Sequence, residues 1–414
     1  MPQLRSDCFS RFSSAHCIRR APWLLPVSSP PVADGGIAVQ AGIIAAAGPF
    51  REVRRSWPGA QVIDHPDCVL LPGLINAHAH LELSHLSQLG RQPAPPSFPA
   101  WIERLLAARS QAAADEATIL QAARQVLAAQ QAEGVVVLAD ISNSGLTSQL
   151  AADYSGRLLV FKEYLGLRAD SATAALLRLQ QESEEQPCTG HAPYSTHPAL
   201  LRGLKARANR LGHVFPIHTA ESFAEIELLR TGGGPFRAFL TERGLWDGAF
   251  QPLGKTGGAV HYLRQHGLLD SRTLCVHCVH IDAEEIALLA ESGAKVCLCP
   301  GSNRSLGVGA APLASLLRHG ILPAIGTDSL ASNPELSVWR ELRLLAEEQP
   351  GVPPNILLAM ATLGGAAALG LNKLGSLETG KEAVILAARL ERVPASAAAA
   401  QEEMLLGPSA VQRL

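Results

Sequence analysis

The stretch LLPGLINAHAHLELSHL, residues 70–86, decides the fold. Its apolar run ends in His78 and His80, and an unpaired imidazole at the end of such a run is costly. Two histidines one residue apart on a strand point to the same face, because side chains alternate between the faces of a sheet. The pair therefore predicts a strand that brings two nitrogen ligands to one place, where other polar groups should meet them.

Further along the chain, short apolar or β-branched runs alternate with long helical stretches rich in Ala, Leu and Arg. This alternation is typical of repeated strand–helix units around a parallel sheet. Eight such strands predict a (β/α)8 barrel over residues 71–374. The predicted strands are residues 71–80, 134–140, 158–166, 188–193, 214–221, 273–278, 294–300 and 322–328.

The two ends of the chain differ from this pattern. Between residues 17 and 70, short apolar runs alternate with Gly, Pro and Asp turns, as in antiparallel β structure. Strand-and-turn character returns after about residue 375. We therefore expect residues 17–70 and 375–414 to form one small, discontinuous β-sandwich domain. The alanine-rich stretch from about residue 393 fits either a helix or a loose terminus.

Bulk composition narrows the class of protein. The 414 residues are 47% hydrophobic and 17% charged, with a formal net charge of -2, which describes a well-buried globular chain. The absence of a long basic run argues against nucleic acid or an anionic membrane as partner and favours a small-molecule substrate. Eight cysteines are too few for a disulfide scaffold and suit a reducing cytoplasm. No continuous apolar run follows the basic N-terminus and no 18-residue apolar span occurs, so secretion and membrane spanning are not predicted.

Unusual polar residues recur at the predicted ends of the strands, where a barrel builds its active site. Three imidazoles and one carboxylate among them can form the first shell of a catalytic zinc or iron and leave one position open for water. A glutamate beside such a water is a natural proton shuttle. The residues are His78 and His80 on strand 1, His191 on strand 4, His218 and Glu221 on strand 5, His277 on strand 6 and Asp328 on strand 8.

Simpler interpretations exist for several of these residues. Asp328 could belong to a turn or cap a helix, and Glu221 could be a first-turn glutamate favoured by the helix dipole. Cys275 and Cys278, with Cys297 and Cys299 on the next strand, could form a thiolate zinc site in a binding module. Buried free cysteine commonly packs as a small hydrophobe, however. The repeated polar strand ends favour the histidine site.

Six motifs in a fixed order carry a resemblance over roughly residues 20–385. They are PGLINAHAH, HAPYS, HTAES, HCVH, CPGSNRSLGVGAAP and GTDSLASNPEL. With them the chain resembles the amidohydrolase superfamily, in its mononuclear deaminase and chlorohydrolase branch. Glu82 in HAHLELS, the HAPYS motif and SNR at 302–304 make it most similar to the aminodeoxyfutalosine deaminases.

The resemblance implies one divalent metal ion, zinc or alternatively iron. Binuclear members use a carboxylated lysine on strand 4, whereas Lys162 falls on the predicted third strand, which favours one metal. The implied ligands are His78, His80, His218 and Asp328. Of the other residues, Glu221 would transfer protons, His277 and Asp328 would hold and help deprotonate the water, and His191, Glu82 and Arg304 would contact the substrate.

The expected reaction is hydrolytic deamination of an aminopurine nucleoside such as aminodeoxyfutalosine, a step of menaquinone biosynthesis. The alternatives are a deaminase of S-adenosylhomocysteine, methylthioadenosine, guanine or cytosine, or a chlorohydrolase or amidase of the same branch. A catalytically silent scaffold would be expected to lose metal ligands, and this chain retains the whole set. Whether the chain forms a homodimer is left open.

Overall fold

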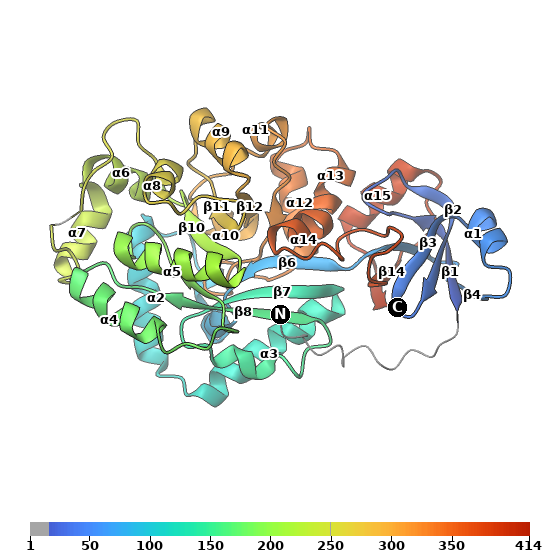
Figure 1. Cartoon of the computed structure of the whole chain (residues 1–414), viewed down its shortest axis with the longest axis horizontal. Helices are drawn as coiled ribbons and strands as arrows, with labels where there is room; N and C mark the ends of the chain where they lie inside the picture. Colours follow the sequence, from blue (N-terminus) through green and yellow to red (C-terminus); the bar gives the residue numbers. More distant parts are fainter. Residues whose placement is uncertain (1–15, 249) are drawn as a thin grey trace.

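The computed structural model describes residues 16–248 and 250–414 of the chain. Figure 1 shows a larger α/β part and, at one end of the molecule, a smaller sheet that contains both the first strands and the last strands of the chain. The prediction that the basic N-terminus is not a secretion signal rests largely on residues 1–15, which lie outside the described residues. Within the described part, no helix is both long enough and apolar enough to cross a bilayer.

The larger part contains two parallel four-stranded sheets, in the orders β6-β7-β8-β9 and β10-β11-β12-β13. A strand overlaps each of the eight predicted ranges, in the predicted order, although β9 and β13 are shorter than predicted. Their bounds are β6 Leu74–Ala79, β7 Val135–Ser142, β8 Arg157–Tyr164, β9 Cys188–Gly190, β10 Phe215–Thr219, β11 Thr273–His277, β12 Lys295–Leu298 and β13 Ala324–Ile325.

The two sheets adjoin each other at both edges through backbone hydrogen bonds. Between β9 and β10, the amide of His218 donates to the carbonyl of His191 at 3.0 Å. Between β13 and β6, the amide of Thr327 donates to the carbonyl of His78 at 2.9 Å, and Ala79 pairs with Asp328 as an isolated parallel bridge. Both contacts lie at the carboxyl ends of the strands, so they bind together the same residues that carry the polar side chains.

Helices separate the strands and begin at local sequence signals. Asp115 caps one of them by accepting from the amide of Thr118 at 2.8 Å, and Asp282 and Glu285 form a reciprocal capping box at another. The helices of this part are α2 Phe98–Ala112, α3 Glu116–Ala132, α4 Ala169–Leu179, α5 Pro198–Leu211, α6 Phe223–Thr231, α7 Gly234–Glu242, α8 Ala259–Gln265, α9 Ala283–Ser292, α10 Pro300–Leu306, α11 Leu313–Arg318, α12 Val338–Glu348, α13 Pro354–Ala359 and α14 Gly365–Ala368. The short turns are η2 Leu81–Leu86, η3 Leu89–Arg91, η4 Leu146–Leu150 and η5 Met360–Gly364.

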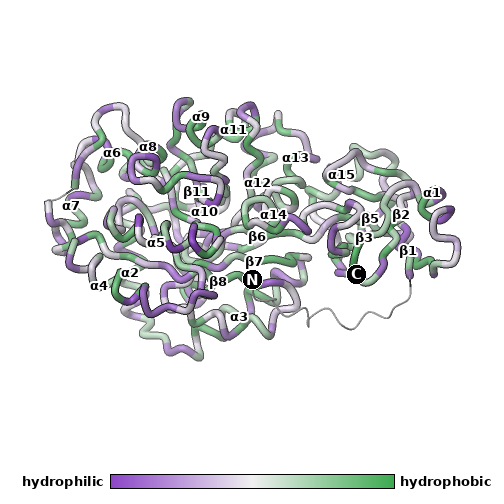
Figure 2. The backbone as a smooth tube through the Cα atoms, in the orientation of Figure 1, coloured by the Kyte–Doolittle hydropathy of each residue, from purple (hydrophilic) through white to green (hydrophobic). Residues whose placement is uncertain are grey.

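The core runs along the parallel strands. All eight residues of β7 are buried, and Figure 2 shows hydrophobic residues along β6 and β7. Gly73 separates β5 from β6, and a Cβ there would lie 2.4 Å from Cγ2 of Val136. Only glycine therefore allows the chain to pass this close to β7. The predicted first strand is accordingly two strands that belong to different sheets.

The smaller part is one sheet of seven strands, in the order β15-β14-β5-β1-β2-β3, with β4 paired to β1. The antiparallel pairing of β14 with β5 joins the first and last parts of the chain in one sheet. A sandwich needs two sheets, and the described residues form one, so the sandwich is not confirmed. The elements are β1 Cys17–Leu24, β2 Val32–Gln40, β3 Ile43–Pro49, α1 Phe50–Ser56, β4 Gln61–Asp64, β5 Cys68–Pro72, β14 Ile385–Arg389, α15 Ala397–Leu406 and β15 Ala410–Arg413.

This sheet has an apolar cluster on each face. Successive residues Ile37 and Ala38 of β2 belong to different clusters, because side chains of a strand alternate between the two faces. Helix α1 covers one face with Val53. The alanine-rich tail forms α15, where Ser396 caps the helix by accepting from the amide of Ala399 at 3.2 Å. The tail is therefore ordered by a cap and followed by a paired strand.

Candidate metal centre and active site

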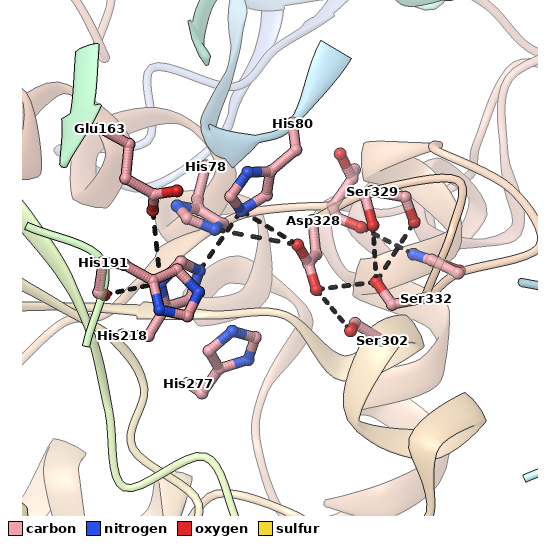
Figure 3. A network of polar contacts seen from close by, with 12 residues as sticks. His78, His80, Glu163, His191, His218, His277, Ser302, Asp328, Ser329 and Ser332 are labelled. Atoms are coloured by element: carbon pink, nitrogen blue, oxygen red, sulfur yellow. Dashed lines mark hydrogen bonds and ion pairs between the residues drawn. The ribbon is translucent and has the colours of Figure 1, made fainter. Parts of the chain in front are cut away.

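Five histidines and Asp328, among the polar residues singled out in the sequence, come together at the carboxyl ends of the strands (Figure 3). His78 lies in β6 and His80 directly follows it, while His218 lies in β10 and His277 is the last residue of β11. Asp328 follows β13. Residues that are far apart in the sequence thus meet because parallel strands end on the same side of the fold.

Their ligand atoms lie at distances that suit a tetrahedral ion. Nε2 of His80 is 3.3 Å from Nε2 of His218 and 3.5 Å from Oδ1 of Asp328, and Nε2 of His78 is 3.9 Å from the same oxygen. Zinc–nitrogen bonds of 2.0–2.1 Å in a tetrahedron place neighbouring ligand atoms about 3.3 Å apart. Both ring nitrogens of His78 are buried without a hydrogen-bond partner. The donor set therefore fits a divalent cation.

Neighbouring groups orient these ligands. Nδ1–H of His218 donates to the carbonyl of His191 at 2.9 Å, which turns Nε2 toward the other ligands. Oδ2 of Asp328 accepts from the hydroxyls of Ser302 and Ser332 at 2.6 and 2.8 Å, which leaves Oδ1 facing the histidines. The candidate ligands His218 and Asp328 are thus each held in one orientation by a second contact.

The pKa values of the histidines and of Asp328 are shifted toward the protonation states that bind a cation. Burial lowers the pKa of His78, His80 and His218, so these imidazoles are neutral, the form that binds a metal. Burial alone would raise the pKa of Asp328, but His80, His277 and His78 together with the Ser302 hydroxyl hold it at about 2. The centre therefore offers neutral nitrogens and one carboxylate.

Glu221 and His277 stand beside this centre. Nε2 of His277 is 3.5 Å from Oε1 of Glu221, and Nδ1–H of His277 donates to Oδ1 of Asn303 at 2.9 Å. The imidazole thus keeps Nε2 free to accept a proton. Burial, and then the charges of Asp328 and Glu225, raise the pKa of Glu221 well above its usual range. A carboxyl group with a raised pKa keeps its proton more readily than a free glutamate does and can donate it to a bound molecule.

The backbone is strained at these strand ends. Non-glycine residues rarely adopt positive φ, and such strain persists only where the surrounding structure holds it. Here φ is 53° at Ala220, 74° at His277, 50° at Cys278 and 57° at Asp328. Strain therefore occurs at the residues that aim the polar side chains.

The residues predicted to contact substrate fall in three different environments. His191 joins the cluster, with its ring centroid 4.7 Å from that of His218 and its Nδ1 2.6 Å from Oγ of Ser195. The carboxylate of Glu82 is enclosed in a network described below. Arg304 does not join the cluster, because its guanidinium pairs at 3.0 Å with each of two glutamates at the end of α12, Glu347 and Glu348. Their contacts with a substrate stay predictions.

Glu163 is a site residue that the sequence analysis missed. It lies in β8 beside Lys162, and its Oε1 is 3.9 Å from Nδ1 of His218. Burial raises the pKa of Glu163 to about 8. Lys162 instead pairs with Glu182 on the other face of the strand. In the strand FKEY, successive side chains point to opposite faces, so only one of Lys162 and Glu163 can face the site. This alternation is the signal that could have identified Glu163.

The cysteines form no metal site within the described residues. Cys275, Cys278, Cys297 and Cys299 are buried and free, and the residue groups whose ligand atoms could hold an ion contain only histidine and acidic side chains. Burial and a neighbouring thiol raise the pKa of Cys278. These thiols therefore pack as apolar groups.

Comparison with known proteins agrees with this geometry. The model of the Amidohydrolase family matches residues 69–403. A 5-methylthioadenosine/S-adenosylhomocysteine deaminase of Moorella thermoacetica is 30% identical over 381 residues, which cover 88% of this chain and 83% of that protein. An aminodeoxyfutalosine deaminase of Deinococcus radiodurans is 31% identical over 367 residues, which cover 81% of each.

Solved structures show the same fold. The crystal structure of Helicobacter pylori aminofutalosine deaminase in complex with methylthio-coformycin superposes with a TM-score of 0.83 at 25% identity and covers 96% of this chain and 100% of that one. An adenosine deaminase of Xanthomonas campestris with bound zinc gives a TM-score of 0.73 at 24% identity, over 91% of this chain and 85% of that one. The arrangement of strands and helices is therefore shared along nearly the whole chain.

Proposed function

Because this chain belongs to the amidohydrolase family and is a hydrolase that acts on carbon–nitrogen bonds, we propose that it deaminates an aminopurine nucleoside. Aminodeoxyfutalosine is the first candidate substrate, and methylthioadenosine and S-adenosylhomocysteine are the nearest alternatives. The single observation that carries the proposal is the convergence of three imidazoles and Asp328 on one point beside Glu221 and His277.

The proposed ligands of one divalent ion, with zinc as the first candidate, are His78, His80, His218 and Asp328. When bound, such an ion supplies Lewis-acid activation of a water molecule. The near-tetrahedral spacing of the ligand atoms supports zinc. The proposal concerns one ion, because Lys162, the lysine nearest in sequence to the site, pairs with Glu182.

The remaining groups divide the proton transfers. His277 and Asp328 hold the attacking water, and Nε2 of His277 can take its proton because Nδ1–H is committed to Asn303. Glu221 delivers a proton to the ring nitrogen next to the amino-bearing carbon, where negative charge would otherwise accumulate. Glu221, left as a carboxylate, then takes the remaining proton of the added hydroxyl group and passes it to the amino group, which leaves as ammonia. The proton held by His277 can return to Glu221, whose Oε1 is 3.5 Å from Nε2 of His277. His191, at the rim of the cluster, is the proposed contact to the purine.

We also propose that the eight parallel strands form one closed (β/α)8 barrel over residues 71–374, with residues 17–70 and 375–414 as a separate small domain. The hydrogen bonds at both edges of the two sheets support closure. The pairing of β5 with β14 supports a domain built from both chain ends. A closed barrel explains why all the site residues meet at one rim.

The test is ammonia release from aminodeoxyfutalosine, S-adenosylhomocysteine, methylthioadenosine, adenosine, guanine and cytosine. We expect the highest kcat/KM with one of the four nucleosides. Chloride release from a chlorinated triazine is measured in parallel, because a chlorohydrolase would use the same ligands. Ammonia release from a free base alone, or chloride release alone, would contradict the proposal.

A further inference from the structure

The carboxyl group of Glu163 is buried with one oxygen engaged and the other without a hydrogen bond. Nδ2–H of Asn143 donates to Oε2 at 2.6 Å, whereas Oε1 has no hydrogen-bond partner among the described residues. The imidazole of His218 is 3.9 Å from Oε1, but its Nδ1–H is already committed to the carbonyl of His191. A buried acceptor left in this state is costly unless a bound molecule satisfies it.

A network of hydrogen bonds joins Glu163 to Asn143 and Glu82 and holds the Glu163 carboxyl group in place. The side chain of Asn143 donates to Oε2 of Glu163, and the backbone amide of the same residue donates to Oε2 of Glu82 at 3.0 Å. The hydroxyls of Ser142 and Ser144 also donate to Glu82. The chain after β7 is therefore held at Glu82, and through Asn143 it holds the Glu163 carboxyl at the rim.

Other buried atoms of this cluster also lack hydrogen-bond partners, and they indicate what kind of group would pair with Oε1 of Glu163. The ring nitrogens of His78 and Nε2 of His277 are equally buried and without hydrogen bonds. In the proposed function, the metal would bind one ring nitrogen of His78 and the water would meet Nε2 of His277. A carboxylate oxygen of Glu163 belongs to the same enclosed group, within 4.8 Å of a nitrogen of His191 and of His218, but Glu163 is not one of the proposed ligands.

Glu163 also lies away from the proton-transfer groups. Glu221 shares its neighbourhood with His277, the last residue of β11, and with Asp328, which follows β13. Glu163 comes from β8 and shares its neighbourhood with His191 and His218 (Figure 3). In the proposed function, it would therefore face a part of the substrate other than the reacting carbon. A hydroxyl group suits this position because it can donate to a carboxylate or accept from a carboxyl.

We propose that Glu163 is a specificity-determining residue that hydrogen-bonds a hydroxyl of the substrate's sugar. The inference rests on the proposed function, because only a nucleoside brings a sugar to the site. A pocket that hydrogen-bonds a substrate hydroxyl rejects analogues that lack it, since its buried partner is then left unpaired. The chain should therefore discriminate between ribonucleosides and one of their deoxy analogues through this carboxyl group.

The test combines variants with substrate analogues. Wild type, Glu163→Gln and Glu163→Ala are assayed with the preferred ribonucleoside and with its 2′-deoxy and 3′-deoxy forms. We expect Glu163→Ala to lower kcat/KM for the ribonucleoside about 10- to 100-fold, and Glu163→Gln to lower it less. For the analogue that lacks the contacted hydroxyl, both variants should match wild type. Lys162→Gln, on the other face of the same strand, is the control and should leave every value unchanged.

Bound metal and thermal midpoint are measured for every variant. An equal loss with all three substrates would overturn the inference, as would loss of metal from Glu163→Gln, which would mean that Glu163 acts by supporting His218. If wild type releases no ammonia from any nucleoside, the proposed function fails first and this inference falls with it. If wild type is active but the effect of the Glu163 variants on kcat/KM is the same with and without the hydroxyl, this inference fails while the proposed function stands.

Discussion

The rim of the parallel strands and the small sheet at the chain ends differ in the kinds of side chain that they bury. The two clusters of the small sheet contain only apolar side chains, and charged residues such as Arg20 and Asp34 stay 40% and 57% exposed. At the rim, His78 and His277 are almost completely buried with nitrogens that lack partners. The rim therefore gathers several unpartnered nitrogens in one place, as a ligand site does, whereas in the described part of the small sheet only Nε2 of His65 is in this state.

The largest expected effect is at the metal ligands. His78→Ala should lose bound metal and, with it, all measurable ammonia release, because the remaining three ligands no longer surround the ion. Metal per chain from elemental analysis, together with the ammonia assay, checks this result. His319→Ala, an exposed histidine, and Cys278→Ala serve as controls. If the cysteine variant alone lost metal, the thiols would be the metal ligands, and the contrast drawn between the rim and the small sheet would be wrong.

Glu221→Gln should lower kcat about 10²- to 10⁴-fold with metal retained, because an amide cannot shuttle the proton. Single-turnover and steady-state assays, with metal analysis on the same samples, measure the effect. The matched control is Glu284→Gln, whose side chain is 72% exposed. Near-normal turnover by the Glu221 variant would remove this residue from the mechanism.

The small sheet should respond in stability rather than in chemistry. Ile37→Ala deletes a fully buried side chain and should lower the free energy of unfolding by about 2–5 kcal/mol, with kcat unchanged while the protein is folded. Urea denaturation and the ammonia assay separate the two quantities. Ile43→Ala, at a position 39% exposed, should cost less than about 0.5 kcal/mol. A parallel fall of kcat in the Ile37 variant would show that the two regions are coupled.

Ser302→Ala removes one of the two hydroxyls that hold Asp328. Metal affinity should fall about 10- to 100-fold, because outer contacts fix the orientation of a ligand. Competition with a chelator gives the affinity, and Ser305→Ala on the same helix is the control. Unchanged affinity would mean that the Ser332 hydroxyl is sufficient on its own.

The smallest effect is expected at the surface of the sheet. Arg20 pairs with Asp34 at 2.7 Å, but both side chains are well exposed. Arg20→Ala should therefore change the free energy of unfolding by less than about 1 kcal/mol. The difference should shrink further in 1 M salt, where charges are screened within about 3 Å. A loss above 2 kcal/mol would mean that charge, and not only apolar burial, stabilises this sheet.

The sequence reveals the parts of this molecule that depend on local periodicity. The eight strands and the polar residues at their ends follow from alternation and order, because each strand end is marked by its own residues. Contacts between side chains distant in sequence could not be found in this way. The pairing of Arg304 with Glu347 and the partially satisfied carboxyl of Glu163 depend on the packing of α10 against α12 and of β8 against β7. A single sheet with two apolar faces has the same residue pattern as a sandwich, which is why the latter was expected.

The strand order at the chain ends also bears on biosynthesis. Strand β5 leads through Gly73 directly into the strand that carries His78, and one of its edges pairs with β14, near the end of the chain. While the ribosome is still translating, that edge has no intramolecular neighbour until residues 385–389 have emerged. Strand β5 is therefore paired on both edges only after residues 385–389 have been made, and a nascent chain cut short before that point would lack the pairing with β14.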